Sequence, residues 1–282
     1  MTLTLVIIVS AGAAMPIELS QAKSAKTHLE IARAMDTSGN EDAAEGEFRL
    51  AIGAHERDYV EALEWYSYFL AHRHRCGEAA HFFEGYIREA GDKAHAEEQN
   101  TLKDLQNAAN LATRVQAENP ALPDLLEFAR LIRRYSKDRF RAALPYAEKA
   151  LRLYPASSEA HLEFAIVLDA TLSTDYERIC HHVERAIELG ANSAIAYNRR
   201  GNCHARYNRL DDAIADYQRA IQISRGDLID AYSALGFAFA RQARNKEALE
   251  ALHRYLDSGQ PVLPQRYLVE TKIQELEKRP PR

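Results

Sequence analysis

A repeat of about thirty-five residues is the feature that most constrains the fold of this 282-residue chain. The tetrapeptide LEFA occurs at residues 126–129 and again at 162–165, thirty-six residues later. A Tyr-x-x-x-Gly pattern occurs at Tyr197–Gly201 and again at Tyr232–Gly236, thirty-five residues later. Periods of this length are typical of stacked helix pairs, in which neighbouring pairs together bury the apolar faces that one pair alone would leave exposed.

The composition of the chain favours helices over strands. Alanine, leucine, glutamate and arginine dominate, and these residues are strong helix formers. The chain has only twelve glycines and nine prolines, which is too few for a sandwich of many short strands. Hydrophobic residues make up 46% of the chain and charged residues 27%, enough for a buried core beneath a solvated surface. We therefore expect an all-α protein.

The two clearest repeats share aromatic, glycine and alanine positions. Tyr197, Gly201 and Ala213 of one repeat correspond to Tyr232, Gly236 and Ala248 of the other; the pattern continues with Tyr217 and Ala220 in the first repeat and includes Phe239 and Leu252 in the second. In these residues the chain resembles the tetratricopeptide-repeat family. Four looser units start near His28, Leu63, Leu125 and His161, the last two loosened by two-residue insertions. The resemblance implies a right-handed α-solenoid of helix-turn-helix repeats with a C-terminal capping helix.

Small residues recur at one position of every unit. They are Ala32, Ser67, Ala129, Ala165, Gly201 and Gly236. A glycine in the middle of a helix costs about 1 kcal/mol relative to alanine. It is tolerated where a larger side chain would hold two helices apart, so we expect this position to mark where the two helices of a pair cross.

The repeats and the stretches between them predict the domain organisation. We expect an N-terminal leader or disordered segment (1–24), two repeats (25–92), a long connecting helix (93–121), four repeats (122–261), and a capping helix and tail (262–282). The connecting helix carries an apolar stripe of Leu102, Leu105, Ala109, Ala112 and Val115 and is either a degenerate repeat helix or a hinge. In the capping helix Val269, Ile273 and Leu276 share one face.

The N-terminus and the cysteines bear on the compartment. The opening MTLTLVIIVSAGAAM has an apolar run, but no basic residue precedes Lys23, and the run is too short to span a bilayer. Cys76, Cys180 and Cys203 are odd in number and lack a C-x-x-C spacing, so they form no disulfide framework and suit a reducing compartment. We expect a cytoplasmic protein, with a start at Met15 or a dispensable leader. If residues 1–14 act as a signal, the protein is periplasmic or secreted.

The resemblance also implies a function. Tetratricopeptide arrays bind peptides or helices of partner proteins in a concave groove lined by the first helix of each pair, which implies a non-catalytic interaction scaffold. Asn198, Asn202 and Arg206 fall at groove positions of the 197 repeat, although an ordinary polar inner face is the alternative. Leu29 and Arg33 stand where dicarboxylate-clamp proteins have lysine and asparagine, so the clamp pattern is not met.

Charge is distributed unevenly along the chain. The net charge of −5 argues against a general nucleic-acid binder. Between Arg130 and Arg152, however, eight basic residues face only two acidic ones. Helical spacing places Arg130, Arg133 and Arg134 on one side of their helix, where an acidic peptide, a C-terminal carboxylate or a phosphorylated segment could bind. The alternative is a solvated face paired with nearby acids. The lack of interleaved aromatic side chains on this face argues against RNA binding.

Histidine and cysteine cluster at three places without a metal-binding pattern. His72, His74 and Cys76 lie in HRHRC, Cys180 precedes two histidines, and Cys203 precedes His204. Adjacent helical residues point about 100° apart, and zinc requires converging ligands, so we expect no metal and read His204 as a packing residue. The chain also lacks G-x-S-x-G, H-E-x-x-H and dinucleotide motifs. We therefore expect that the chain binds no cofactor and is not an enzyme. Two alternatives to an interaction scaffold remain: an exported envelope-associated assembly or secretion accessory protein, and an RNA-binding repeat protein.

Overall fold

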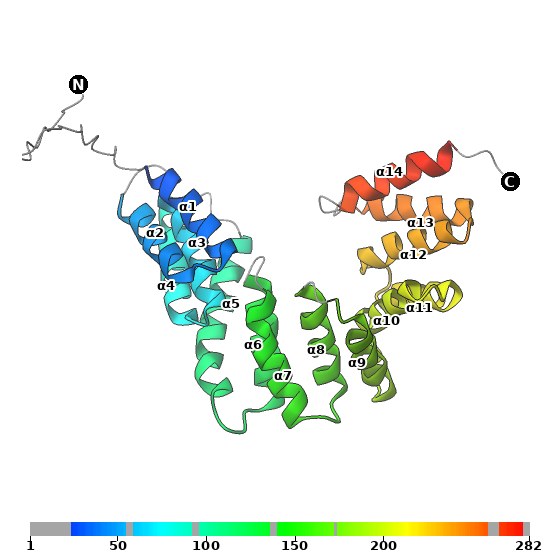
Figure 1. The fold of residues 1–282 in the computed structure, drawn as a ribbon, viewed down its shortest axis with the longest axis horizontal. Helices are drawn as coiled ribbons and strands as arrows, with labels where there is room; N and C mark the ends of the chain where they lie inside the picture. The colour runs from blue at the N-terminus through cyan, green and yellow to red at the C-terminus, as the bar shows by residue number, and fades with distance from the viewer. Residues whose placement is uncertain are drawn as a thin grey trace, which may run out of the picture. The chain divides into compact units, whose positions relative to one another are not determined.

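In the computed structural model, residues 24–54, 59–91, 96–135, 140–171, 174–258 and 265–278 are described, and they form helices joined by turns (Figure 1). The α-helices are α1 (Ala25–Ser38), α2 (Glu41–Gly53), α3 (Tyr59–His72), α4 (Cys76–Ala90), α5 (Ala96–Val115), α6 (Leu122–Tyr135), α7 (Leu144–Leu153), α8 (Ser158–Ala170), α9 (Tyr176–Glu188), α10 (Ala194–Arg206), α11 (Leu210–Ile223), α12 (Ile229–Arg241), α13 (Asn245–Asp257) and α14 (Gln265–Glu277). A 3-10 helix, η2 (Phe140–Ala143), precedes α7. The described residues contain no strand, and the all-α fold class is confirmed.

The chain divides into two compact units. The first unit contains residues 1–113 and 134–142, and the second contains residues 114–133 and 143–282. In the first unit α1 packs against α2 and α3 against α4; in the second, α8 packs against α9, α10 against α11 and α12 against α13 (Figure 1). These are helix pairs that the repeats predict. The division into leader, repeats, connecting helix and cap stays a prediction, and all of the leader except Ser24 lies outside the described residues.

Side-chain caps explain where several of the helices begin. The hydroxyls of Ser24, Ser157 and Ser193 accept hydrogen bonds from backbone N–H groups in the first turns of α1, α8 and α10. The carboxylate of Asp175 does the same for α9. Each cap satisfies a donor that the helix leaves without a partner, a contribution of about 1 kcal/mol.

Backbone geometry repeats with the same period as the sequence. Gly39 and His74 have positive φ angles between the helices of the first two pairs, and they lie thirty-five residues apart. Asn208 and Ala243 have positive φ angles at the equivalent turns of two later pairs, again thirty-five residues apart. A left-handed residue at this place reverses the chain within a short turn, so one turn geometry serves several repeats although only Gly39 is a glycine.

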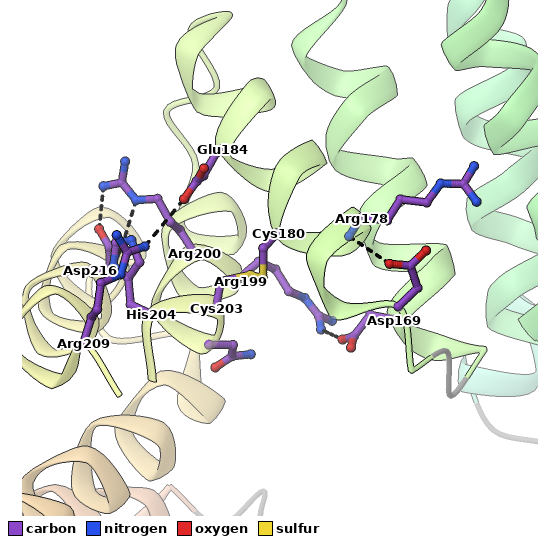
Figure 2. The surroundings of a disulfide bond; sticks show 12 residues. Asp169, Arg178, Cys180, Glu184, Arg199, Arg200, Cys203, His204, Arg209 and Asp216 are labelled. Carbon is purple, nitrogen blue, oxygen red and sulfur yellow. Dashed lines mark hydrogen bonds and ion pairs between the residues drawn. A yellow bond between two sulfur atoms is a disulfide. The ribbon is translucent and has the colours of Figure 1, made fainter. Parts of the chain in front are cut away.

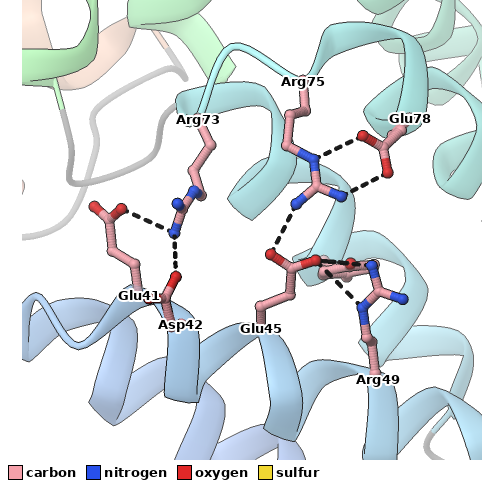
Figure 3. Close-up of polar contacts among 8 residues, drawn as sticks. Glu41, Asp42, Glu45, Arg49, Arg73, Arg75 and Glu78 are labelled. Carbon is pink, nitrogen blue, oxygen red and sulfur yellow. Dashed lines mark hydrogen bonds and ion pairs between the residues drawn. The ribbon is translucent and has the colours of Figure 1, made fainter.

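The first unit is held by aromatic packing and by charge pairs between helices. The rings of Phe48 and Phe69 lie 5.1 Å apart between centroids, and both side chains are buried. Beside them, Arg75 donates to Glu45 on α2 and to Glu78 on α4 (Figure 3). Burial of Glu45 opposes its ionisation, but hydrogen bonds from Arg75, Arg49 and Tyr66 lower its pKa to about 2. Glu45 thus pairs with two arginines of the same unit, Arg49 and Arg75.

The close approach expected at the small residues is confirmed at Gly201 and Gly236 of the second unit. All six of the small residues are buried. A Cβ atom added to Gly201 would lie 2.6 Å from Cε1 of Tyr217. One added to Gly236 would lie 2.6 Å from Cγ of Leu252 and 3.2 Å from the backbone oxygen of Ala248. Each glycine lets the first helix of its pair touch the second.

The core of the second unit continues into the last helix. Val269, Ile273 and Leu276 are buried, as expected, against residues of α13 that include Leu252 and Tyr255. The apolar face of α14 therefore covers the last helix pair, and its exposed residues include Arg266, Glu275 and Glu277 together with Tyr267 and Leu268.

The stripe expected on the connecting helix is correct in part. Leu105 and Val115 of α5 are buried, and Ala108 and Leu111 complete the buried face. The other three residues of the expected stripe are half-buried: Leu102, Ala109 and Ala112. The helical period of 3.6 residues accounts for the difference, because buried positions follow one another at steps of three or four residues.

Candidate functional site

Three of the predicted site residues lie on α10. Asn198, Asn202 and Arg206 are four residues apart, which places them along one side of the helix. Ile195 is on the same side one turn earlier, and 47% of its surface is exposed. The Oδ1 atom of Asn198 is buried and accepts no hydrogen bond from the residues that the structure describes. This side of α10 thus offers an apolar contact, an unused acceptor and a cation.

A cavity of about 250 Å³ opens beside α10, between α8 and α9. Its lining residues are Asp169, Tyr176, Ile179, Cys180, Arg199, Asn202, Cys203 and Arg206. Asn202 and Arg206 both line the cavity, whereas Asn198 is outside the lining. The sequence did not single out Arg199, although it shares a helix face with Asn202 and Arg206 at spacings of three and seven.

A disulfide between Cys180 and Cys203 forms part of the cavity wall (Figure 2). The expectation that the cysteines form no disulfide is wrong for this pair. Cys180 is on α9 and Cys203 on α10, and their Cα atoms are 5.6 Å apart, within the range that a disulfide requires. Stacking of one repeat on the next brings them together, which a search for local spacings such as C-x-x-C does not detect.

Polar groups surround the mouth of the cavity. Arg199 pairs with Asp169 at the end of α8 (Figure 2). Asn202 accepts a hydrogen bond of 2.9 Å from the hydroxyl of Tyr217. The guanidinium of Arg206 stacks on the ring of Tyr176 and has no carboxylate partner among the described residues. Arg206 is thus a cation at the cavity whose charge no acidic side chain of the described chain neutralises.

The three arginines predicted on α6 do not form one cluster of free cations. Arg130 and Arg133 each lie 3.3 Å from a carboxylate oxygen of Glu163 on α8, and this glutamate is only 3% exposed. Arg134 belongs to the first unit, where it pairs with Asp104 at 2.6 Å. The arginines are therefore paired with acids, as the alternative reading of this surface expected. Arg130 and Arg133 thus share the single carboxylate of Glu163.

These pairs follow a spacing that the sequence could have shown. Arg133 and Glu163 are thirty residues apart, and so are Asp169 and Arg199. Such pairs join the first helices of successive repeats. A separation a few residues short of one period places the two side chains next to each other on these adjacent helices. We call Arg130, Arg133, Glu163, Asp169, Arg199, Asn202 and Arg206 the first-helix face of the second unit. It holds four arginines and two carboxylates.

His204 and His74 lie beside oxygen atoms, and Cys76 is a free, buried thiol. His204 lies 3.2 Å from the buried carboxylate of Asp216, which also accepts two hydrogen bonds from Arg200 (Figure 2). Burial raises the pKa of Cys76 to about 12, so this thiol is protonated at neutral pH. The Nε2 atom of His74 lies 2.9 Å from the backbone oxygen of Ala142.

Two further searches cover the described residues alone. Within them, no three His, Cys, Asp or Glu side chains converge where they could hold a metal ion. No helix in the same part of the chain has both the length and the apolar character that a membrane crossing requires.

Comparison with known proteins agrees with the helix pairs. A tetratricopeptide-repeat family model matches residues 194–227, which contain α10 and α11. A small glutamine-rich tetratricopeptide repeat-containing protein of Saccharomyces cerevisiae is 35% identical over 88 residues, which are 31% of this chain and 25% of that protein. The match thus spans about a quarter of that relative's length.

The solved structures that match this chain include tetratricopeptide proteins. One from Parabacteroides merdae has 13% identity and a TM-score of 0.46, covering 90% of this chain and 99% of its own. YrrB, described as a tetratricopeptide protein with an unusual peptide-binding site, has 18% identity and a TM-score of 0.43, covering 80% and 97%. The repeat at 194–227 is thus similar to the tetratricopeptide-repeat family, and the other helix pairs of the chain share its period.

Proposed function

We propose that this chain is a non-catalytic scaffold that binds an extended segment of a partner protein across the first-helix face of its second unit. The tetratricopeptide fold is typical of protein-interaction scaffolds, which supports the general function. The observation that carries the specific site is the cavity beside α10, which unites Asn202 and Arg206 with apolar side chains. Pockets with an apolar lining and a few convergent polar groups are the usual form of a binding site.

The charges of this face favour an acidic segment. Arg130 and Arg133 are 44% and 31% exposed at the side chain, and each donates to Glu163 through its Nε atom. A guanidinium carries five N–H donors, so its terminal nitrogens can bind a second carboxylate while Nε keeps its partner. Arg206 adds a cation without an acidic partner among the described residues. A segment with aspartate or glutamate would therefore meet complementary charge.

A peptide-display selection followed by calorimetry tests this proposal. Random peptides are selected on the immobilised full chain, and an enriched peptide is then titrated into the wild type and into Arg206→Glu. We expect the substitution to weaken binding about tenfold or more, because a charge-assisted hydrogen bond is replaced by like-charge repulsion. Arg254→Glu is the matched control, since Arg254 is an exposed arginine of α13 outside the first-helix face. Absence of any enriched peptide family, or an equal loss in both variants, would contradict the proposal.

One observation favours a second candidate function. The Cys180–Cys203 disulfide suits an oxidising compartment, so we also propose an exported assembly or secretion accessory protein in place of a cytoplasmic one. Intact cells are treated with a membrane-permeant thiol-alkylating reagent, then lysed and fractionated, and each fraction is analysed by mass spectrometry. An exported protein would show Cys180 and Cys203 joined and unalkylated, whereas alkylation of both in a cytoplasmic fraction would exclude this alternative.

A further inference from the structure

The cavity beside α10 has an apolar interior and a charged mouth. Ile179, Cys180 and Cys203 are between 4% and 6% exposed and belong to its wall, and the disulfide adds a surface without hydrogen-bond donors. Asn202 and Arg206 are on the exposed side of α10. Such an arrangement favours a ligand group that is apolar at its tip and polar at its base.

The size of the cavity sets the size of that group. An apolar protein cavity of about 150 Å³ holds a benzene molecule, so about 250 Å³ admits a phenylalanine-sized side chain. A small side chain such as alanine would leave most of the volume unfilled and would lose the contacts that close packing provides.

The charges at the mouth select what flanks this side chain. Arg199 and Arg206 line the cavity with only Asp169 to offset them, and Arg199 is the residue that Asp169 contacts. The guanidinium of Arg206 therefore faces a ligand with its charge uncompensated among the described residues. A carboxylate one residue from the apolar side chain would lie within reach of it.

We infer that this cavity is an anchor pocket for a bulky apolar side chain, with an aspartate or glutamate beside it, in the bound segment. The inference rests on the proposed function, and it identifies the kind of segment that is bound. The disulfide contributes directly to this pocket. It forms part of the pocket wall and joins α9 to α10, two of the three helices that line the pocket.

Methyl NMR on the full chain with small probes tests the pocket independently of any selected peptide. The isoleucine methyl groups are labelled, and N-acetyl-Phe-Asp-amide, N-acetyl-Ala-Asp-amide and N-acetyl-Phe-Lys-amide are titrated in turn. The Ile179 methyl reports the pocket, and that of Ile273 in α14 serves as reference. We expect a saturable shift of Ile179 with the first probe, binding about tenfold weaker for the alanine probe, and weaker binding for the lysine probe.

Two substitutions separate the apolar and the charged parts of the inference. Asn202→Phe places a ring at the mouth and is expected to abolish the Ile179 shift, whereas Gln222→Phe, an exposed position of α11, leaves it unchanged. Arg206→Gln is expected to remove the preference for the aspartate probe over the lysine probe while the Ile179 shift remains. An unchanged Ile273 methyl shows that each variant is folded.

The outcomes distinguish this inference from the proposed function. If display-selected peptides bind through Arg206 but no phenylalanine probe moves Ile179, the pocket is not an anchor and the scaffold proposal stands. If the probes bind as expected but no peptide family is enriched, the pocket stands and the scaffold proposal fails. Equal binding of the phenylalanine and alanine probes, or a Ile179 shift that survives Asn202→Phe, would overturn the inference.

Discussion

Replacing Gly201 with alanine tests whether close helix packing explains this glycine. Alanine is favoured over glycine in a helix by about 1 kcal/mol, so Gly201→Ala would stabilise a helix in isolation. In the structure, however, the new Cβ atom would lie 2.6 Å and 2.8 Å from two ring carbons of Tyr217. That ring is 2% exposed and its hydroxyl donates to Asn202, so it cannot turn aside without breaking other contacts.

The magnitude follows from these two opposing effects. Overpacking a close contact costs about 1–3 kcal/mol, and the helix preference offsets about 1 kcal/mol of it. We expect a net destabilisation of up to about 2 kcal/mol, which lowers the Tm by up to about 8 °C in a unit of this size. Gly46 on α2 is the matched control, because an added Cβ there would meet no atom within 4 Å. Gly46→Ala should therefore stabilise the chain by about 1 kcal/mol.

Thermal melts and hydrogen exchange measure both variants. Repeat arrays need not unfold in a single step, so exchange of the backbone amides of α10 and α11 locates the effect. We expect faster exchange there in Gly201→Ala and slower exchange in α2 in Gly46→Ala. If Gly201→Ala stabilised the chain by about 1 kcal/mol, as is expected of Gly46→Ala, the glycine would not be explained by the approach of α10 to α11.

Three further predictions concern pH and the disulfide. Because the pKa of Glu45 is lowered to about 2, this carboxylate stabilises the folded chain fully above pH 4.5, and the stabilisation is lost as the pH falls towards 2. Glu45→Gln should therefore flatten this part of a profile of Tm against pH. Burial, together with the charges of neighbouring basic groups, lowers the pKa of His182 to about 4, so stability should fall between pH 6.5 and 4, and His182→Gln should remove that step. The disulfide closes a loop of 23 residues, so substituting Cys180 and Cys203 by alanine should cost about 3 kcal/mol, and a melting temperature insensitive to reductant would contradict the bond.

The sequence was sufficient for the architecture because repeat period and helix crossing are local properties. Gly201 and Gly236 could be assigned to helix crossings from their spacing and from the cost of glycine in a helix. The cap also followed from spacing, since Val269 and Ile273 are one turn apart. In each case residues close in sequence determine the geometry.

The candidate site was only partly accessible to the same reasoning. Asn202 and Arg206 followed from their helix face, but the contacts that define their surroundings come from other repeats. Cys180 and Cys203 meet because α9 and α10 stack, and the cysteines carry no spacing motif. Equally, helical spacing predicted which side of its helix Arg133 lies on. It did not show that Arg133 pairs with Glu163, a buried glutamate thirty residues later.

Photo-crosslinking of the bound peptide tests the central claim, the use of the first-helix face, most directly. Benzoylphenylalanine is placed at Arg130, at Arg206 or, as a control, at Arg254, and each chain is irradiated with a display-selected peptide before mass spectrometry. The account predicts crosslinks from Arg130 and Arg206 and none from Arg254. Crosslinks from Arg254 alone would show that the peptide binds elsewhere on the chain and would contradict the account.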